Sequence, residues 1–174
     1  MENGCCVLMR AQADSNMAAT CFETAFGSCA IVWELSGITG FSLQPSQRRI
    51  QRPPPWIEAI ILRVQRHLAG NLQDFADLPY SWHAVSIFQR KVYQAALGVK
   101  PGQMASYGQL AITVGYPSTP RNVGHALGQN PWPLLVPCHR FIGADGRMTG
   151  FSAPGGITTK LRLLALEGAQ LFAE

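Results

Sequence analysis

Two short helices with sharply marked ends are predicted between residues 106 and 128, and they constrain the fold of this 174-residue chain more than any other segment. Ser106-Tyr107-Gly108-Gln109 has the Ser-x-x-Gln form of a capping box, so a helix should begin there and end before Gly115. Thr119 followed by Pro120 predicts the start of a second helix over 121–128. This is a helix-turn-helix pattern, and the small residues of its second helix suit either close approach to a partner or tight packing in a core.

The rest of the second half is predicted to be mostly helical. A helix is expected at about 87–97. Residues 130–137, just before Cys138, are expected to be extended, with a buried apolar part at 134–136. A glycine-rich loop is expected over 150–156, and Thr158 should cap a last helix at about 159–167.

The first half has a different pattern. Residues 21–43 mix aromatic and β-branched residues with glycine-containing breaks, which predicts two or three short antiparallel strands. Three prolines then lead into a helix at about 56–68, and 71–85 is expected to be irregular. The predicted buried stripe of that helix is Trp56, Ile57, Ile60, Ile61, Val64 and Leu68. The fold class is therefore α+β, with a sheet-and-helix domain over 1–84 and a mostly helical domain over 85–174.

Charge divides at the same boundary. Residues 1–84 hold six basic and seven acidic side chains, whereas residues 85–174 hold eight basic and three acidic ones. The stretch 78–144 contains no carboxylate at all. A surface built from it would suit a polyanion, although a gap containing so few charges can also arise by chance.

Membrane and secretory classes are not supported by the composition. No apolar run approaches the roughly 18 residues of a spanning helix, and the first twenty residues are interrupted by charges. We therefore expect a soluble protein of a bacterial cytoplasm, or of the nucleus if the source is eukaryotic. The five cysteines should stay reduced there, and no zinc site is expected because their spacing fits no standard zinc pattern.

The most reactive candidate is Cys138, which is followed directly by His139 and Arg140. A cysteine needs a base or a positive field to become a nucleophile, and adjacent side chains rarely face each other, so His139 would take the thiol proton through a water. A carboxylate must orient the imidazole, and Glu167, at the end of the last helix, is best placed among the three acids of this half. Taken alone, a Cys-His pair such as Cys138-His139 is more often a small buried hydrophobe than a nucleophile with its base.

Six motifs in this order overturn that alternative, because together they resemble the O6-alkylguanine-DNA alkyltransferase family over about residues 86–168. The acceptor signature Pro137-Cys138-His139-Arg140 is the most specific of them. The motifs are Tyr107-Gly108-Gln109-Leu110-Ala111, Arg121-Asn122-Val123-Gly124, Asn130-Pro131, Val136-Pro137-Cys138-His139-Arg140, Gly150-Phe151-Ser152 and Leu164-Ala165-Leu166-Glu167-Gly168. Residues 1–85 fit only loosely, as a small ribonuclease H-like sheet-and-helix domain.

The resemblance implies a reaction and a set of site residues. Cys138 would take the alkyl group from guanine O6 irreversibly, with His139 and Glu167 as its relay and without a cofactor. Tyr107 would protonate the leaving guanine, Ser152 would lie at its O6, and the backbone carbonyls of Cys138 and Phe141 would accept from its exocyclic amine. The expected DNA contacts are Arg121, Asn122, Val123, Gly124 and Arg140. Asn130 would support the turn that carries Cys138.

The implied function is repair of double-stranded DNA by a monomer, with nucleotide flipping from the minor groove and O4-alkylthymine as a second candidate substrate. Arg121 would fill the vacated stack. Two residues, Ala153-Pro154, look inserted in the active-site loop, and Phe151 stands where some members have Tyr. The alternatives are a non-catalytic damage sensor, which Cys138 argues against, and a Cys-His hydrolase, which only the glycine-rich loop supports.

Overall fold

The computed structural model describes residues 17–46 and 51–169. Its first half is a three-stranded antiparallel sheet in the order β1-β2-β3, formed by Ala18–Thr24, Gly27–Glu34 and Gly37–Leu43. Two tight turns connect the strands, and the second turn requires a glycine. Gly37 has a φ of 139°, and a side chain there would collide with the carbonyl of Pro79.

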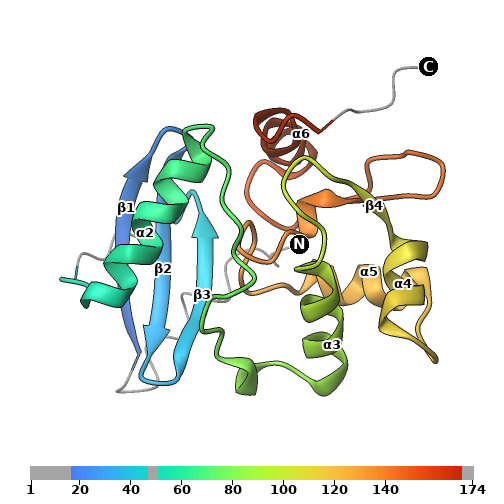
Figure 1. Cartoon of the computed structure of the whole chain (residues 1–174), viewed down its shortest axis with the longest axis horizontal. Helices are drawn as coiled ribbons and strands as arrows, with labels where there is room; N and C mark the ends of the chain where they lie inside the picture. The colour runs from blue at the N-terminus through green and yellow to red at the C-terminus, as the bar shows by residue number, and fades with distance from the viewer. Residues whose placement is uncertain (1–16, 47–50, 170–174) are drawn as a thin grey trace.

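One long helix, α2 (Pro55–Leu68), lies across this sheet, as Figure 1 shows. Its buried face consists of Ile57, Ile60, Val64, His67 and Leu68. The predicted stripe is therefore confirmed except at Trp56 and Ile61. Trp56, in the first turn of the helix, is 37% exposed, and Ile61 is only half-buried.

The connection between the halves has no regular structure apart from one turn of 3-10 helix, Trp82–Ala84, as predicted. It follows the outer edge of β3, where Ile38 donates its N–H to the carbonyl of Pro79 and accepts from the N–H of Ser81. The domain boundary near residue 84 stays a prediction, because a single hydrophobic core runs through both halves.

The second half packs three helices against one another, α3 (Ile87–Ala96), α4 (Tyr107–Val114) and α5 (Pro120–Gly128). The predicted capping box of Ser106 and Gln109 is present, and the expected Thr119 cap accepts from the N–H of Asn122 at 3.2 Å. The helix-turn-helix and the α+β class are thus confirmed. Two very short strands, β4 (Ala105–Ser106) and β5 (Phe141–Ile142), pair in parallel and join α4 to the segment after Cys138.

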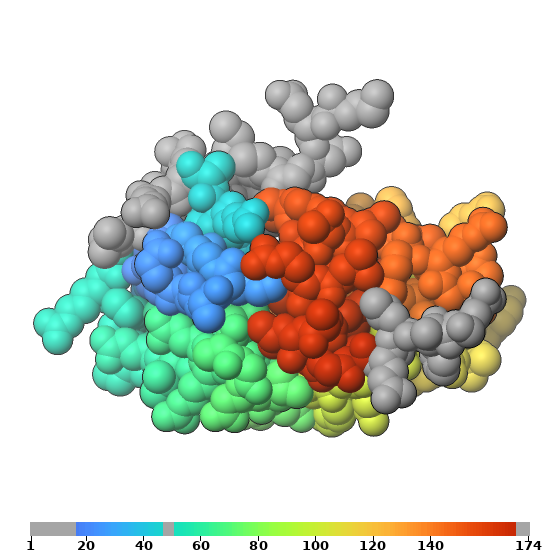
Figure 2. All heavy atoms as spheres, turned by 90° about the horizontal axis from the view of Figure 1, so that it is seen from above, coloured from blue at the N-terminus to red at the C-terminus, as the bar shows by residue number. Residues whose placement is uncertain are grey.

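The last helix, α6, covers Gly156–Leu166 and begins earlier than predicted. Gly155, in the left-handed conformation at φ 83°, precedes it, so Thr158 lies inside the helix and the prediction that it is the cap is wrong. Thr159 instead donates its hydroxyl to the carbonyl of Pro154. Figure 2 shows α6 against the first hairpin, where the Arg162 guanidinium lies 4.2 Å from the centroid of the Phe26 ring.

Among the residues that the structure describes, no helix has the length and apolar character needed to cross a lipid bilayer.

Candidate active site

Cys138 begins a single turn of 3-10 helix, Cys138–Arg140, and its side chain is buried. Asn130, just after α5, donates its Nδ2 to the carbonyl of Val136 at 3.0 Å and lies 3.3 Å from the Cys138 Sγ. Its Oδ1 accepts from the N–H of Trp132 at 2.9 Å. These three contacts place Asn130 between the end of α5 and the turn that carries Cys138.

Burial raises the pKa of the Cys138 thiol, and two side chains, together with backbone hydrogen bonds, oppose that effect. One is the hydrogen bond from Asn130, and the other is the positive charge of Lys160. Lys160 extends from α6 as a fully buried cation, and its Nζ donates to the backbone carbonyls of Phe141 and Thr149. Burial lowers the pKa of Lys160, whereas the neighbouring Cys138 raises it. A thiolate formed at Cys138 would therefore have a cation beside it.

His139 and Glu167 meet behind the thiol. Glu167 follows the last turn of α6, and its Oε1 lies 3.1 Å from the Nε2 of His139, with both side chains inaccessible to solvent. Burial alone would raise the pKa of Glu167, but hydrogen bonds from His139, His67 and Arg140 outweigh it and hold that pKa far below its usual range. Glu167 is therefore a carboxylate, which accepts hydrogen bonds only.

His139 is held as a neutral base. Burial lowers the pKa of its imidazole, and the contact with Glu167 opposes this without cancelling it. With a proton on Nε2 donated to Glu167, the Nδ1 lone pair is left to accept a proton. That Nδ1 is buried and has no hydrogen-bond partner among the described residues.

Arg140 has a different place from the one predicted. Its side chain is buried, donates Nε and Nη2 to the two oxygens of Glu167 at 2.9 and 2.7 Å, and donates Nη1 to the carbonyl of Val99. The prediction that Arg140 contacts DNA is wrong, because its guanidinium is used inside the protein. The sequence predicted a surface position because Arg140 is one of the basic residues in the stretch 78–144, which has no carboxylate.

Two site residues were missed from the sequence, His67 and Lys160. The Nε2 of His67, from α2, lies 3.0 Å from the same Glu167 Oε1. Helical spacing could have indicated that both residues are buried. His67 lies three positions after Val64 on the buried face of α2, and Lys160 shares the buried face of α6 with Leu163 and Leu164. Polar residues on an apolar stripe are candidates for buried, partnered groups.

A surface pocket opens beside this buried cluster, between α4, α5 and the loop of residues 149–152. It is lined by Tyr107, Pro120, Arg121, Gly124, Gly128, Thr149, Gly150, Phe151 and Ser152. Two of its aromatic rings also reach the cluster: the Tyr107 ring lies 6.4 Å from that of Phe141, and the Phe151 ring lies 6.5 Å from that of His139. The pocket thus gathers Tyr107, Arg121 and Ser152 from three separate segments.

Two polar groups at the pocket have defined surroundings. Burial raises the pKa of Tyr107, which a hydrogen bond with Thr149 opposes, so its phenol stays protonated and can donate. The carbonyl of Phe141, expected to accept from a bound base, already accepts from Lys160.

The predicted DNA contacts on α5 differ in exposure. Arg121 is exposed and Gly124 is half-buried at the pocket. Val123 is fully buried, so the prediction that its side chain contacts DNA is wrong. Asn122 is occupied by the helix cap, since its Oδ1 accepts from the N–H of Thr119 at 2.7 Å.

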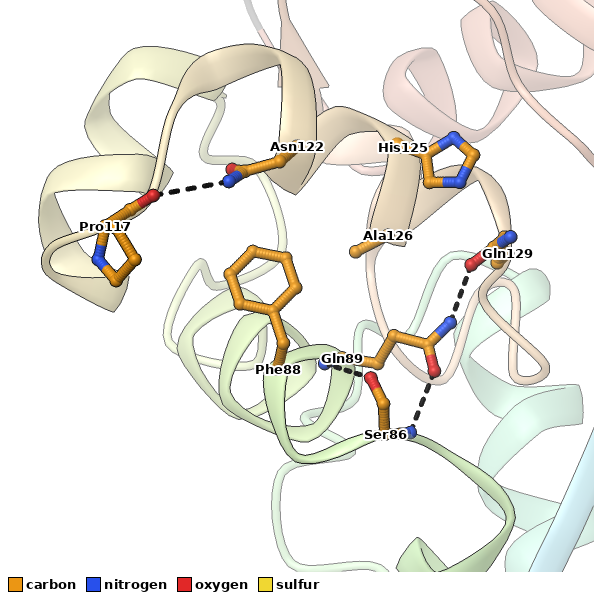
Figure 3. Close-up of a pocket in the computed structure, with 8 residues that line it drawn as sticks. All are labelled: Ser86, Phe88, Gln89, Pro117, Asn122, His125, Ala126 and Gln129. Carbon is orange, nitrogen blue, oxygen red and sulfur yellow. Dashed lines mark hydrogen bonds between the residues drawn. The ribbon is translucent and has the colours of Figure 1, made fainter.

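A second surface pocket lies on the other side of α5, against the start of α3 (Figure 3). Three of its eight lining side chains are amides, and Gln89 donates to Gln129 across it at 2.7 Å. The pocket at Tyr107 is the one next to the relay, because its Phe151 ring packs against His139.

In the described part of the chain, no group of three His, Cys, Asp or Glu residues is arranged so that it could hold a metal ion. Cys5 and Cys6 lie outside the described residues. Cys29 is buried in β2, and burial raises the pKa of its thiol to about 12.

Known proteins resemble this chain over nearly all of its length. The model of the 6-O-methylguanine DNA methyltransferase DNA-binding domain matches residues 87–169. A methylated-DNA–protein-cysteine methyltransferase of Methanosarcina acetivorans is 30% identical over 154 residues, which cover 85% of this chain and 96% of the relative. One of Mycobacterium tuberculosis is 36% identical over 131 residues, covering 75% and 77%.

Solved structures agree with this. The O6-methylguanine methyltransferase of Mycobacterium tuberculosis superimposes with a TM-score of 0.75 at 29% identity, over 91% of this chain and 96% of that one. The same methyltransferase in complex with DNA gives a TM-score of 0.72 at 33% identity, over 86% and 92%. From its buried cysteine, its relay and these relatives, the chain belongs to the methylated-DNA–protein-cysteine methyltransferase family.

Proposed function

We propose that this protein repairs alkylated DNA by moving the alkyl group from guanine O6 to the sulfur of Cys138, where it stays as a thioether. The observation that carries the proposal is the environment of the thiol: a buried sulfur contacted by Asn130, beside a cation, with a His–Glu pair directly behind it. No other cysteine of the described chain has a histidine as its neighbour in sequence.

The first half of the reaction is the activation of the thiol. His139 accepts the thiol proton at Nδ1 through a bridging water, and Glu167 stabilises the imidazolium that forms. Lys160 and Asn130 stabilise the thiolate that remains. The thiolate then attacks the alkyl carbon, so the S–C bond forms as the C–O bond to guanine breaks.

The second half is the departure of guanine. The electron pair of the broken bond passes to the base, and the phenol of Tyr107 donates a proton to a ring nitrogen so that the base leaves neutral. Ser152 and the Cys138 carbonyl would hold its polar edge. The Cys138 thioether cannot be reversed by any group in this site, so each molecule acts once.

Access to the pocket requires the damaged nucleotide to leave the duplex. Arg121, exposed at the start of α5 and on the rim of the pocket, is placed to enter the stack that the nucleotide vacates. A weakly paired base costs less to flip, which favours alkylated guanine and extends in principle to O4-alkylthymine. We propose a monomer bound through the minor groove by α5, and a cytoplasmic location stays a prediction.

Intact mass of the protein after mixing with DNA that contains O6-methylguanine tests the proposal. The mass should rise by one methyl group located on Cys138, and Cys138→Ala should not react. Cys29→Ala is the matched control, because it removes a buried cysteine away from the pocket and should react like the wild type. An unchanged wild-type mass with retained binding to the damaged DNA would instead indicate a sensor.

A further inference from the structure

His67 connects the first half of the chain to the relay of the second. It lies in the last turn of α2, it is fully buried, and its Nε2 is 3.0 Å from the Glu167 Oε1. The ring of Phe75 packs beside it at 5.3 Å between centroids. An imidazole from the sheet-and-helix half therefore touches the carboxylate that holds His139.

The backbone determines which nitrogen of His67 carries the proton. The N–H of Gln73 points at the Nδ1 of His67 from 3.0 Å, so Nδ1 must accept. A neutral imidazole with an accepting Nδ1 has its proton on Nε2. His67 therefore donates to Glu167, and the Gln73 backbone fixes both the tautomer and the plane of the ring.

Glu167 is thereby held from three directions. Its Oε1 accepts from His67, His139 and Arg140, while its Oε2 accepts from Arg140 alone. Without His67, Oε1 would keep two donors and the carboxylate could turn about its last torsion. A rotation of the carboxylate would move the acceptor away from His139.

We propose that His67 is a positioning residue for alkyl transfer, which holds Glu167 in the orientation that accepts from the His139 Nε2 and so leaves the His139 Nδ1 to accept a proton. This rests on the proposed function of Cys138. It also gives the N-terminal half a direct part in the chemistry of the C-terminal half.

The same contact affects the basicity of His139. The groups that act on its imidazole are Glu167, Arg140 and His67, and the ring of Phe151 packs against its edge. The positive charge of Arg140 lowers the pKa of His139, while Glu167 raises it. Removing the His67 donor leaves more of the carboxylate charge for His139, so the pKa of His139 should rise.

Single-turnover methyl transfer from an O6-methylguanine duplex, measured across pH, tests the proposal. His67→Phe keeps the ring but not the donor, and it should slow transfer about tenfold near neutral pH, the scale of a hydrogen bond to a charged group. The acid limb of its pH–rate profile should move to higher pH. His67→Gln, whose amide can donate to Glu167, should recover most of the rate and return the limb toward its wild-type position.

The matched control is His83→Phe, since His83 is an exposed histidine of the same half, 64% accessible, that contacts Glu34 and not the relay. It should react like the wild type. A His67→Phe protein that matches the wild type in rate and in pH profile overturns the proposal, as does a lower rate with an unmoved acid limb. Failure of the wild type itself to transfer methyl would count against the proposed function.

A measurement on the wild type is independent of how well the variants fold. Nitrogen-15 NMR of the histidine rings should show His67 with its proton on Nε2, and that signal should shift in Glu167→Gln. A proton on Nδ1 would contradict the proposal.

Discussion

At the scale of single residues, Lys160 and Cys138 form the most consequential pair in the site. A buried cation without a carboxylate partner is costly, and among the described residues Lys160 is compensated by two backbone carbonyls and the nearby sulfur. This cost is consistent with a role in the reacting state, in which the sulfur becomes negative.

Replacing Lys160 by Met should therefore raise the pKa of the Cys138 thiol further. The rate at which iodoacetamide alkylates Cys138 in the native protein near neutral pH should fall about tenfold, because a rise of about one pKa unit lowers the thiolate fraction by that factor. The pH dependence of this alkylation, with Cys138→Ala as the blank, measures the shift.

Arg162→Met is the control for that experiment, because Arg162 is an exposed cation two positions further along α6 that contacts Phe26 rather than the site. Its alkylation profile should be that of the wild type. An equal loss in both variants would mean that net charge, and not the position of Lys160, sets the reactivity of the thiol.

Arg140 and Arg121 should differ in what their loss affects. Arg140→Ala leaves Glu167 buried without its cation and should lower the free energy of unfolding by about 3–5 kcal/mol. Arg121→Ala removes an exposed side chain and should change stability by less than about 0.5 kcal/mol, yet slow repair of duplex DNA much more than reaction with a free alkylguanine base. Urea unfolding and the two rates measure these effects, and equal loss on both substrates would remove Arg121 from flipping.

At the scale of secondary-structure elements, the caps of the second half were largely readable from sequence. The Ser106 box and the Thr119 start are both present, since a cap depends on residues three positions apart and on little else. Another capping box, of Ser86 and Gln89, opens α3 and follows the same rule, although it was not singled out from the sequence.

Thr119 should contribute to the stability of α5 through this cap. Thr119→Ala removes the acceptor for the Asn122 N–H and should cost about 1 kcal/mol of unfolding free energy. Because the cap also orients the turn before Arg121, affinity for duplex DNA should fall as well. Urea unfolding and DNA titration follow the two effects.

The neighbouring Ser118→Ala is the matched control for the cap. The Ser118 hydroxyl is buried without a hydrogen-bond partner in the described structure, so its removal should be neutral or slightly stabilising. A loss of stability in Ser118→Ala as large as in Thr119→Ala would show that the turn, and not the cap, is the source.

The start of α6 shows where the local rules failed. Thr158 has the right residue type for a cap, but Gly155 can adopt a left-handed φ, and the hydroxyl of Thr159 reaches back to Pro154. Ala153, one of the two residues that look inserted, is buried in the core and anchors this loop. Whether Thr158 or Thr159 bonds to the backbone before α6 depends on the position of the preceding loop, which is determined by tertiary contacts.

At the scale of the whole molecule, the two halves share one interior. Trp132 lies at their junction: its Nε1 donates to the Ile38 carbonyl of β3 at 3.0 Å, and its ring packs on Tyr80, Trp82 and Tyr93. His67 and Glu167 form a second, polar connection. The N-terminal half therefore contacts the site directly, through the hydrogen bond of His67 to Glu167.

Stability should consequently depend on pH through the buried relay. The pKa of His139 is lowered in the folded state, so its contribution is complete above its unfolded pKa of about 6.5 and is lost as pH falls below that value. Unfolding free energy should therefore drop between about pH 7 and about pH 5.5, by at most about 1.4 kcal/mol per pH unit for this group. The pKa of Glu167 is depressed, so its own contribution is lost only below about pH 4.3.

Urea unfolding at several pH values measures this slope. His139→Gln, which has no ionisable imidazole, should show a shallower slope over the same range. His125→Gln is the control, since His125 is exposed on α5, and it should keep the wild-type slope. A wild-type slope in His139→Gln would contradict the assignment.

The sequence by itself determined most of the helices and strands, the helix-turn-helix and the candidate nucleophile, because periodicity, caps and a contiguous motif are local properties of the chain. It also singled out Glu167 by residue type. Only the tertiary structure decided that Arg140 faces inward to Glu167, that Val123 lies in the core, and that His67 and Lys160 complete the site. These assignments depend on segments up to 100 residues apart. Which side chain satisfies a buried charge depends on how those segments pack, and no local pattern contains that information.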